Sequence, residues 1–510
     1  MIATTTQRMD NLTRWFATRP LLAAAALLLT AWVTLLWPAI LNGQPFMLHD
    51  TTAYFRGAAY PAERLLDLKT AWSQTQPTAV PSQVIAGVHA KPASSVEDKT
   101  VYAGRSVYYG SLLFWAYVVG GLWLPVMLQA AIVALALFMA FQVFVPRPAL
   151  TTAGTLVGLG ALTPLPWFTD YLVPDVFAGL GLLAAAMLLT VLDKMTTATR
   201  AFWFALLSFA LAAHNSHVAT IACVLAVTAF GTFVLRRSFK PAGYAWAAAA
   251  IGVALLGEVA FNLAVTKVAG APPVRPPILT ARVMASETGA AYLRAVCPVA
   301  TYAVCPYADR APMVGNDFLW NPDAAIGVFT VAEPATRRAL GEEQMRVFFG
   351  AFAHAPIAMT REMLTRWWLL ASSVRLDEFN HGPAERTYFA AKLPNDMYDT
   401  LLASPSGQGM LPVGALRLIF LPVTVGCAIA LVLLAPRDEN AAMREFALIV
   451  VVGVLINAAV CSALSGVEPR YQARIVWLIP FAAYVLALRR RDVWAWLGPR
   501  HERAAKPLTA

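Results

Sequence analysis

Long apolar blocks, separated by short polar segments, dominate the pattern of the chain. Most blocks come close to the roughly 20 residues that an α-helix needs to cross a membrane. They run over residues 20–42, 121–145, 149–166, 174–192, 201–214, 217–235, 243–265, 411–435, 445–463 and 474–488. Strands of a membrane barrel would give short segments of alternating apolar and polar residues instead. The pattern therefore predicts an all-α membrane protein with about ten transmembrane helices.

The composition agrees with this prediction. Of the 510 residues, 58% are hydrophobic and 13% are charged, whereas about a quarter of the residues of an ordinary soluble domain are charged. So few charged residues cannot cover the surface of a water-soluble globule of this size.

The net charge of +10 comes largely from basic residues between the apolar blocks. These residues are Arg8, Arg14, Arg19, Arg147, Lys194, Arg200, Arg236, Arg237, Lys240, Arg437, Arg444, Arg489, Arg490 and Arg491. Because basic residues favour the cytoplasmic side, we expect these segments and both termini in the cytoplasm. The basic patch interleaved with aromatic residues that would indicate nucleic-acid binding is absent. The first block is too long for a cleaved signal peptide and is expected to remain as a helix.

Two long segments interrupt the membrane pattern and divide the chain into three parts. Residues 1–266 form an N-terminal transmembrane module that includes a first outer loop over 43–109. Residues 267–410 form a large outer loop or domain, and residues 411–510 form the last helices and a cytoplasmic tail. The aromatic run at 107–115 predicts an interfacial helix at the end of the first loop, since Tyr and Trp favour headgroup depth. A segment as long as 267–410 is expected to be folded or to carry function.

Two of the five cysteines, Cys297 and Cys305, lie close together in the large outer loop. In an oxidising compartment this spacing favours a disulfide that closes a short loop. A metal site is the weaker interpretation, because no further cysteine or histidine lies nearby in the sequence.

Acidic residues gather where apolar blocks end on the outer side. The pair His49 and Asp50 follows the first block, and Asp170 and Asp175 lie at the outer start of the fourth. A carboxylate just above the bilayer can act as a general base if its surroundings tune its pKa. Asp50 and Asp175 can equally cap the helices that start beside them.

Arginines also occur on the outer side, where positive charge in short loops is normally avoided. Arg470 and Arg474 are four residues apart and suit the binding of a phosphate group, although ordinary interface anchoring is the alternative. Arg275 and Arg282, after a proline-rich stretch, are further candidates for phosphate binding.

Three other ionisable residues allow more than one interpretation. His214 and His217 have a spacing that can place two metal ligands on one helical face, but their sequence also suits a polar turn. Glu258 lies inside an apolar block, where an ionisable group is costly and is often functional or paired with an arginine.

This layout resembles the GT-C fold of polytopic membrane glycosyltransferases. The resemblance rests on the acidic segment 48–54 directly after the first block, the aromatic run at 107–115 and the segment 171–179 at the outer start of the fourth block. It implies a bacterial inner-membrane enzyme of the inverting type whose active site faces the periplasm. Its donor would be a polyprenyl-phosphate sugar, and its acceptor an envelope glycan, lipid or protein.

The resemblance also implies roles for individual residues. Asp50 takes the position of the catalytic base, and Arg470 and Arg474 are the candidates for holding the lipid phosphate. Family members often carry paired acids in the first loop, where this chain has His49 and Asp50. A divalent cation as cofactor therefore stays open.

Rival interpretations remain. An O-antigen-type polymerase or ligase would place its essential residues mainly in 267–410. A transporter or flippase of envelope precursors often shows internal repeats, which are absent here. A non-catalytic assembly partner would tolerate the replacement of Asp50, whereas the proposed enzyme would not.

Overall fold

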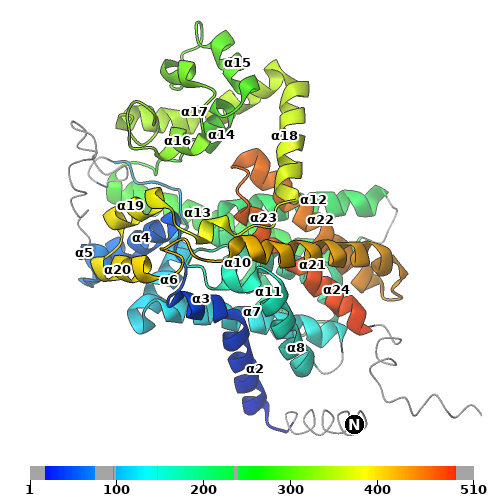
Figure 1. Ribbon diagram of the computed structural model, residues 1–510. Helices are drawn as coiled ribbons and strands as arrows, with labels where there is room; N and C mark the ends of the chain where they lie inside the picture. The colour runs from blue at the N-terminus through cyan, green and yellow to red at the C-terminus, as the bar shows by residue number, and fades with distance from the viewer. Residues whose placement is uncertain (1–17, 75–95, 97–98, 146–147, 235–238, 490–510) are drawn as a thin grey trace, which may run out of the picture.

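The computed structural model describes residues 18–74, 96, 99–145, 148–234 and 239–489 (Figure 1). Within these ranges the chain is helical, apart from two isolated β-bridges, and this confirms the all-α prediction. Of the basic residues named above, Arg8, Arg14, Arg147, Arg236, Arg237, Arg490 and Arg491 lie outside the described residues.

Seven helices in the described ranges are long and apolar enough to cross a membrane. They are α7 (Trp123–Phe144), α10 (Val176–Val191) with η1 (Leu192–Lys194), α12 (Asn215–Val234), α13 (Pro241–Ala269), α21 (Val413–Leu434) with η4 (Ala435–Arg437), α22 (Ala441–Leu464), and α23 (Arg470–Val476) continued by α24 (Leu478–Arg489). Four apolar helices are shorter, namely α2 (Pro20–Leu35), α6 (Val107–Gly120), α8 (Pro148–Leu162) and α11 (Thr197–Ala213).

Of the roughly ten predicted spans, seven thus correspond to helices that are long and apolar enough to cross a membrane. The first predicted span divides at Leu36 into α2 and α3 (Trp37–Asn42), because Pro38 occupies the start of the second helix. The third predicted span ends at Leu162, two residues before Pro164, and is continued by the short α9 (Leu165–Thr169). Proline rather than polarity limits the length of both helices.

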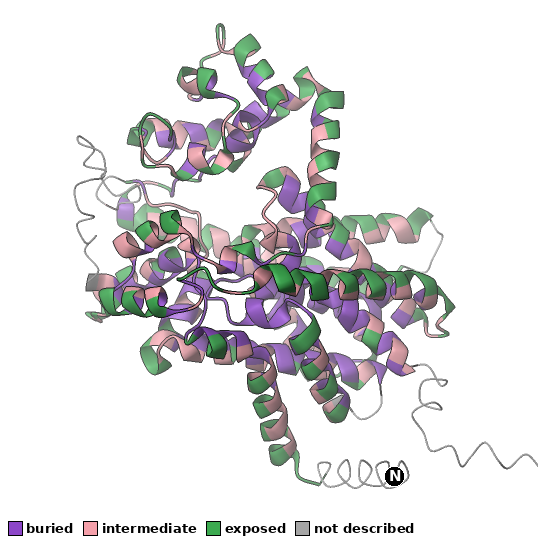
Figure 2. Ribbon diagram, viewed as in Figure 1, coloured by how far each residue is buried: buried purple, intermediate pink, exposed green. Residues whose placement is uncertain are grey.

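Helix α10 forms the centre of the bundle of apolar helices named above, which we call the membrane module (Figure 2). All of its residues are buried, and α11, α13 and α22 pack around it. Its small residues, such as Gly179 and Gly181, allow this close approach of neighbouring helices. In contrast, α13 and α21 expose large apolar side chains such as Leu263 and Leu418, as expected for helices that contact lipid.

The first outer loop contributes α4 (His49–Leu66) and α5 (Ala71–Gln74), with α4 packed against α6. Two β-bridges fix the path of this loop. Phe46 pairs with Tyr171, which holds the start of the loop beside the segment before α10. Tyr102 pairs with Val274, which ties the end of the loop to the start of the large outer segment.

The large outer segment falls into two parts. Helices α14 (Ile278–Met284), α15 (Glu287–Val296), α16 (Gly315–Trp320) and α17 (Pro334–His354), with η2 (Cys305–Arg310), surround a hydrophobic core of their own. Cys297 and Cys305 form a disulfide at the edge of this outer domain. Helix α18 (Pro356–Ala371) leads from it to the membrane module, where it packs on α22 (Figure 1).

The second part returns to the membrane module. It contains η3 (Asp377–Phe379), α19 (Pro383–Lys392) and α20 (Asn395–Ala403). Its apolar side chains, including Phe379, Phe389 and Leu401, belong to the core of the membrane module. Residues 267–410 are therefore one segment of sequence that packs as two separate structural parts.

Ion pairs connect the helix ends that carry the basic residues. Lys240 lies 2.8 Å from Glu445, and Arg489 lies 3.6 Å from Asp438. Arg489 also donates a hydrogen bond to the carbonyl oxygen of Phe144 at the end of α7. These contacts gather the ends of α7, α13, α21, α22 and α24 at one end of the bundle. The candidate site lies at the opposite ends of α10 and α22.

Candidate functional site

Asp50 lies in the first turn of α4 but does not cap it. The hydroxyl group of Thr51 instead accepts a hydrogen bond from the backbone N–H of Leu48 and donates one to the carbonyl oxygen of Leu172. The carboxylate of Asp50 is free of the helix backbone and pairs with the guanidinium group of Arg105. The two side chains keep 20% and 28% of their surface exposed, so an incoming molecule can reach them.

Arg105 lies at the end of the first outer loop, and a contact on each side of it in the sequence fixes its position. The bridge between Tyr102 and Val274 precedes it. Ser106 follows it, caps the start of α6, and donates a hydrogen bond to the carbonyl oxygen of Ala212. Because α4 and α6 pack together, Arg105, just before α6, meets Asp50 in the first turn of α4.

A second guanidinium group approaches Asp50 from α23. Arg470 Nη2 lies 3.9 Å from Asp50 Oδ2, and Arg470 Nε lies 3.1 Å from Glu378 Oε2 in η3. Burial alone would raise the pKa of Asp50, but Arg105 and Arg470 outweigh it and lower that pKa below its usual value. Asp50 is therefore held as a carboxylate.

Arg474, one turn further along α23, forms a buried ion pair. Its Nη1 lies 2.5 Å from Oδ1 of Asp175, and the two side chains are 1% and 6% exposed. Its Nη2 contacts Ser216 Oγ at 3.3 Å and Cys461 Sγ at 3.7 Å. This guanidinium group connects α10, α12, α22 and α23 below the more accessible Asp50.

Tyr471 lies between these two arginines in the sequence and contacts both. Its ring centroid is 5.0 Å from the guanidinium carbon of Arg470 and 4.9 Å from that of Arg474. Such cation–π contacts favour the charged groups and fix their orientation. Three carboxylates and three guanidinium groups thus form one cluster: Asp50, Asp175, Glu378, Arg105, Arg470 and Arg474.

His49 and Asp170, both candidates from the sequence, point elsewhere. The ring of His49 stacks on Phe389 of α19 and meets Tyr388 edge-on, with centroid distances of 5.8 and 4.8 Å. Asp170 is fully buried, and its Oδ2 accepts a hydrogen bond from the backbone N–H of Ala39 at 2.8 Å. Burial raises the pKa of Asp170 well above its usual value, and its contact with the first turn of α3 indicates a structural role.

His214 and His217 lie beside the cluster at the start of α12. Their ring centroids are 5.3 Å apart. His214 Nδ1 accepts a hydrogen bond from the backbone N–H of Ser216, and His217 Nδ1 lies 2.7 Å from the carbonyl oxygen of Ala210. In the described ranges no group of three His, Cys, Asp or Glu side chains is arranged to hold a metal ion. The two histidines lie in the turn at the start of α12, next to Arg474.

Arg275 and Arg282 lie outside the cluster. Arg275 is 61% exposed and lies 3.7 Å from Glu258, which gives the glutamate of α13 a basic partner. Arg282 is buried in the outer domain, with Glu362 and Arg366 of α18 nearby. Neither guanidinium group is paired with an acid of the Asp50 cluster.

Two members of the cluster, Arg105 and Glu378, are absent from the sequence candidates. Arg105 carries the same signal as Arg470, since it is a basic residue on the expected outer side next to an apolar helix. Glu378 has no comparable signal. It lies in a long irregular segment, and only the return of that segment to the membrane module brings it to Arg470.

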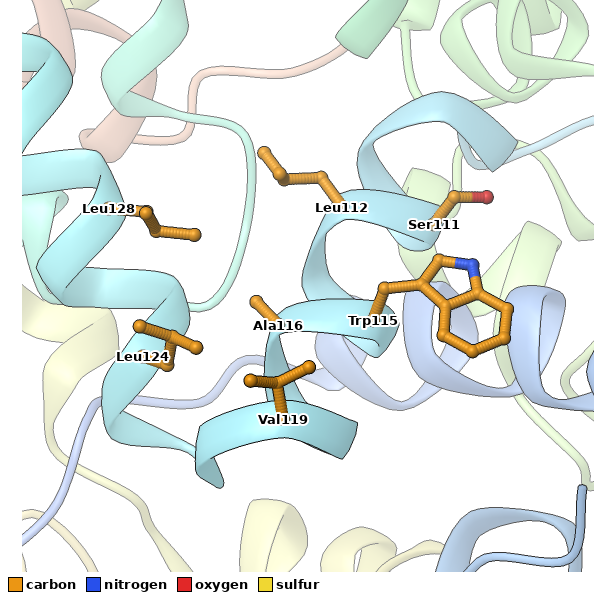
Figure 3. A pocket seen from close by; sticks show the side chains of 7 residues that line it. All are labelled: Ser111, Leu112, Trp115, Ala116, Val119, Leu124 and Leu128. Carbon is orange, nitrogen blue, oxygen red and sulfur yellow. The ribbon is translucent and has the colours of Figure 1, made fainter.

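An apolar groove runs along α6 (Figure 3). It has a volume of about 470 Å³ and lies between Leu112, Trp115 and Val119 on α6 and Leu124 and Leu128 on α7. Ser111, the first lining residue, follows the first residue of α6 by four positions, so the groove starts roughly 6 Å along the helix axis from that end.

Comparison of the chain with protein families, with curated proteins and with solved structures found no match.

Proposed function

We propose that this chain is an integral membrane glycosyltransferase that moves a sugar from a polyprenyl-phosphate donor to a hydroxyl group of an envelope glycan, lipid or protein. The observation that carries the proposal is the contact of Asp50 with both Arg105 and Arg470 at the ends of the membrane helices. A partly exposed carboxylate between two guanidinium groups offers a base and an anion-binding group side by side.

In the proposed reaction, Asp50 removes the proton of the acceptor hydroxyl group as its oxygen attacks the anomeric carbon. The new carbon–oxygen bond forms while the bond between that carbon and the phosphate oxygen breaks. The electron pair stays on the departing polyprenyl phosphate, where Arg470 stabilises the negative charge. Inversion at the anomeric carbon follows from this direct displacement.

The two arginines contribute differently. Arg105 keeps the Asp50 carboxylate ionised and oriented towards the exposed side of the cluster. Arg470 lies 3.9 Å from Asp50 and 3.1 Å from Glu378, so a donor phosphate bound to Arg470 would neutralise the cation that both acids face. When that happens, Asp50 loses one of its two cations and becomes a stronger base. Donor binding would thus prepare the proton transfer.

The groove on α6 and α7 suits the isoprenoid tail of the donor. Its lining is apolar, and α6 begins two residues after Arg105. Replacement of Val119, an exposed side chain in the lining of the groove, by tryptophan would fill the groove without touching the charged cluster. We expect this variant to raise the KM for a long-chain donor more than that for a short-chain donor, whereas a groove without a role would leave both unchanged.

We further propose that the protein lies in a bacterial inner membrane with the cluster facing the periplasm. The basic residues Lys240 and Arg489 lie at the opposite end of the bundle, as expected for a cytoplasmic face. The arginines of the cluster do not oppose this orientation, because each is paired with a carboxylate. Labelling by a membrane-impermeant reagent tests the orientation, with a single cysteine in place of Thr400 in one variant and of Glu439 in another. Both positions are exposed, and the free cysteines Cys223, Cys427 and Cys461 are replaced by serine in both variants.

The direct test is sugar transfer by purified protein from a panel of polyprenyl-phosphate sugars in detergent or proteoliposomes. Transfer of one sugar to an acceptor, with release of polyprenyl phosphate, supports the proposal. Failure of every donor would contradict it and would favour the second candidate.

That second candidate is a transporter of charged envelope precursors. The buried pair of Arg474 and Asp175 favours it, because ionised residues between membrane helices often belong to ion or substrate pathways. Counterflow of a labelled polyprenyl-phosphate sugar across proteoliposomes, without any chemical change of the sugar, distinguishes it from the transferase.

A further inference from the structure

Glu378 shares the guanidinium group of Arg470 with Asp50. Its Oε2 lies 3.1 Å from Arg470 Nε, while Asp50 Oδ2 lies 3.9 Å from Arg470 Nη2. The other carboxylate oxygen of Glu378, Oε1, is buried and has no hydrogen-bond partner within the described part of the chain. A buried carboxylate oxygen without a donor is unfavourable when the group is charged.

The surroundings of Glu378 are mostly acidic. Asp50 approaches from α4, Asp175 from the start of α10, and Glu468 from the turn before α23, whereas Arg470 is the cation that opposes them. Burial and these three acids together outweigh Arg470 and raise the pKa of Glu378 to about 7. Asp50, in contrast, keeps Arg105 as a cation of its own. The two carboxylates that share Arg470 thus differ in pKa, since the pKa of Glu378 is raised and that of Asp50 is lowered.

We propose that Glu378 is a proton-linked counter-ion of Arg470, which a phosphate group displaces when it binds. The phosphate oxygen accepts hydrogen bonds from the guanidinium group of Arg470, whose Nε lies 3.1 Å from Glu378 in the empty site. Glu378 then loses its cation, faces an additional anion, and takes up one proton from water. The inference rests on the proposed function to the extent that it places the donor phosphate at Arg470.

This exchange preserves the charge balance of the cluster. In the empty site above neutral pH, three carboxylates face three guanidinium groups. A phosphodiester with one negative charge, together with one proton on Glu378, leaves that balance unchanged. Without the proton, the bound phosphate would add an uncompensated negative charge to a largely buried cluster.

The exchange makes the affinity for the phosphate depend on pH, and the affinity must fall as the pH rises. Below pH 7 Glu378 is already protonated in the empty site, so Arg470 is available to the phosphate. Above pH 7 each bound phosphate requires the uptake of a proton, so the affinity falls as the pH rises. With a pKa of about 7, the affinity is expected to fall about tenfold between pH 6 and pH 8.

The test is binding of a short-chain polyprenyl phosphoglucose to the purified full-length protein, measured by calorimetry without acceptor. This probe is a phosphodiester, so its own charge does not change in this pH range. The Glu378→Gln variant is expected to bind with the same affinity at pH 6 and pH 8. At pH 8 it should bind about tenfold more tightly than the wild type. Asp377→Asn, an exposed neighbour in the same turn, is the matched control and should behave as the wild type.

Calorimetry in two buffers of different ionisation enthalpy gives a second measurement on the unmodified protein. We expect uptake of close to one proton for each bound probe at pH 8 and little uptake at pH 6. A Glu378→Gln variant that keeps the pH dependence, or that binds more weakly at both pH values, would overturn the inference. Wild-type binding without proton uptake, or no binding at either pH, would do so as well.

The outcomes separate this inference from the proposed function. Proton-linked binding without sugar transfer to any acceptor would leave the counter-ion in place and contradict the transferase. Sugar transfer together with binding that is independent of pH would support the transferase and remove the role of Glu378.

Discussion

Arg474 and Asp175 are 299 residues apart in the sequence, yet their side chains meet at 2.5 Å inside the protein. Only 1% and 6% of the two side chains is exposed. The pair joins the start of α10, the central helix, to α23, and Arg470 extends from the same short helix to Asp50. This buried pair therefore holds the accessible part of the cluster in position.

Removal of one partner of this pair should destabilise the protein strongly. In Arg474→Met the carboxylate of Asp175 stays buried without its cation, which costs about 3–5 kcal/mol of unfolding free energy. The double variant Arg474→Met with Asp175→Leu should recover most of this loss, because no uncompensated charge remains. Denaturant unfolding in detergent measures both. A double variant as unstable as the single one would contradict this explanation.

Arg105 should control the acid limb of the pH–rate profile. Its guanidinium group helps to lower the pKa of Asp50, so Arg105→Gln raises that pKa. The base is then protonated at a higher pH, and the acid limb should move to higher pH. The control is Arg64→Gln, an exposed arginine in the last turn of α4, the helix that carries Asp50. Coincident profiles for wild type and Arg105→Gln would show that Asp50 is not the titrating base.

Gly110 permits the close contact of α4 and α6 that aligns Asp50 with Arg105. A Cβ atom at this position would lie 2.7 Å from the carbonyl oxygen of Tyr54, so Gly110→Ala forces the two helices apart. We expect a loss of about 1–3 kcal/mol in stability. Transfer should fall by about tenfold to a hundredfold, because the two side chains no longer meet in register.

Gly57→Ala is the matched control, since a Cβ atom there would have no neighbour within 4 Å. Alanine is also the better helix former, so this variant should be as stable as the wild type or more so. Equal effects of the two substitutions on the transfer rate would contradict the role given to the helix contact.

Glu378→Gln should change the pH dependence of stability. The folded-state pKa of Glu378 is raised to about 7, above the value of 4.5 for a free glutamate. Its favourable contribution is therefore complete below pH 4.5 and is lost as the pH rises through 7. The difference between the two values corresponds to about 3 kcal/mol at pH 8.

Glutamine resembles the protonated acid and does not ionise. The variant should thus match the wild type near pH 4.5 and become more stable than it by pH 8. Thermal melts of both proteins across this range measure the difference. A variant that is less stable than the wild type at pH 8 would show that the ion pair with Arg470 outweighs the surrounding acids.

The sequence predicts the apolar helices and several members of the cluster because each depends on local signals. Apolar length marks α7, α13 and α22, and an arginine on the expected outer side marks Arg470 and Arg474. The pairing of Arg474 with Asp175 does not follow from either residue, since it depends on how α10 and α23 pack. Asp170 carries the same sequence signal as Asp175 but binds the backbone of α3.

Contacts between segments far apart in the sequence also explain the features that the sequence does not predict. Glu378 reaches Arg470 only because the segment after α18 turns back onto the membrane module. The division of 267–410 into two parts has the same cause, since no change in composition marks it. The limits of α2 and α8 follow from single prolines, which a count of apolar residues passes over.

The most direct measurement is sugar transfer from a polyprenyl-phosphate donor by wild type and Asp50→Asn, with Asp67→Asn as the matched control. Asp67 is an exposed aspartate at the other end of α4 with a φ of 51°, a conformation that asparagine accepts readily. We expect Asp50→Asn to fold normally and to lose transfer by a factor of about a hundred or more, while Asp67→Asn keeps it. Full activity of a well-folded Asp50→Asn protein would contradict the role of Asp50 as the base.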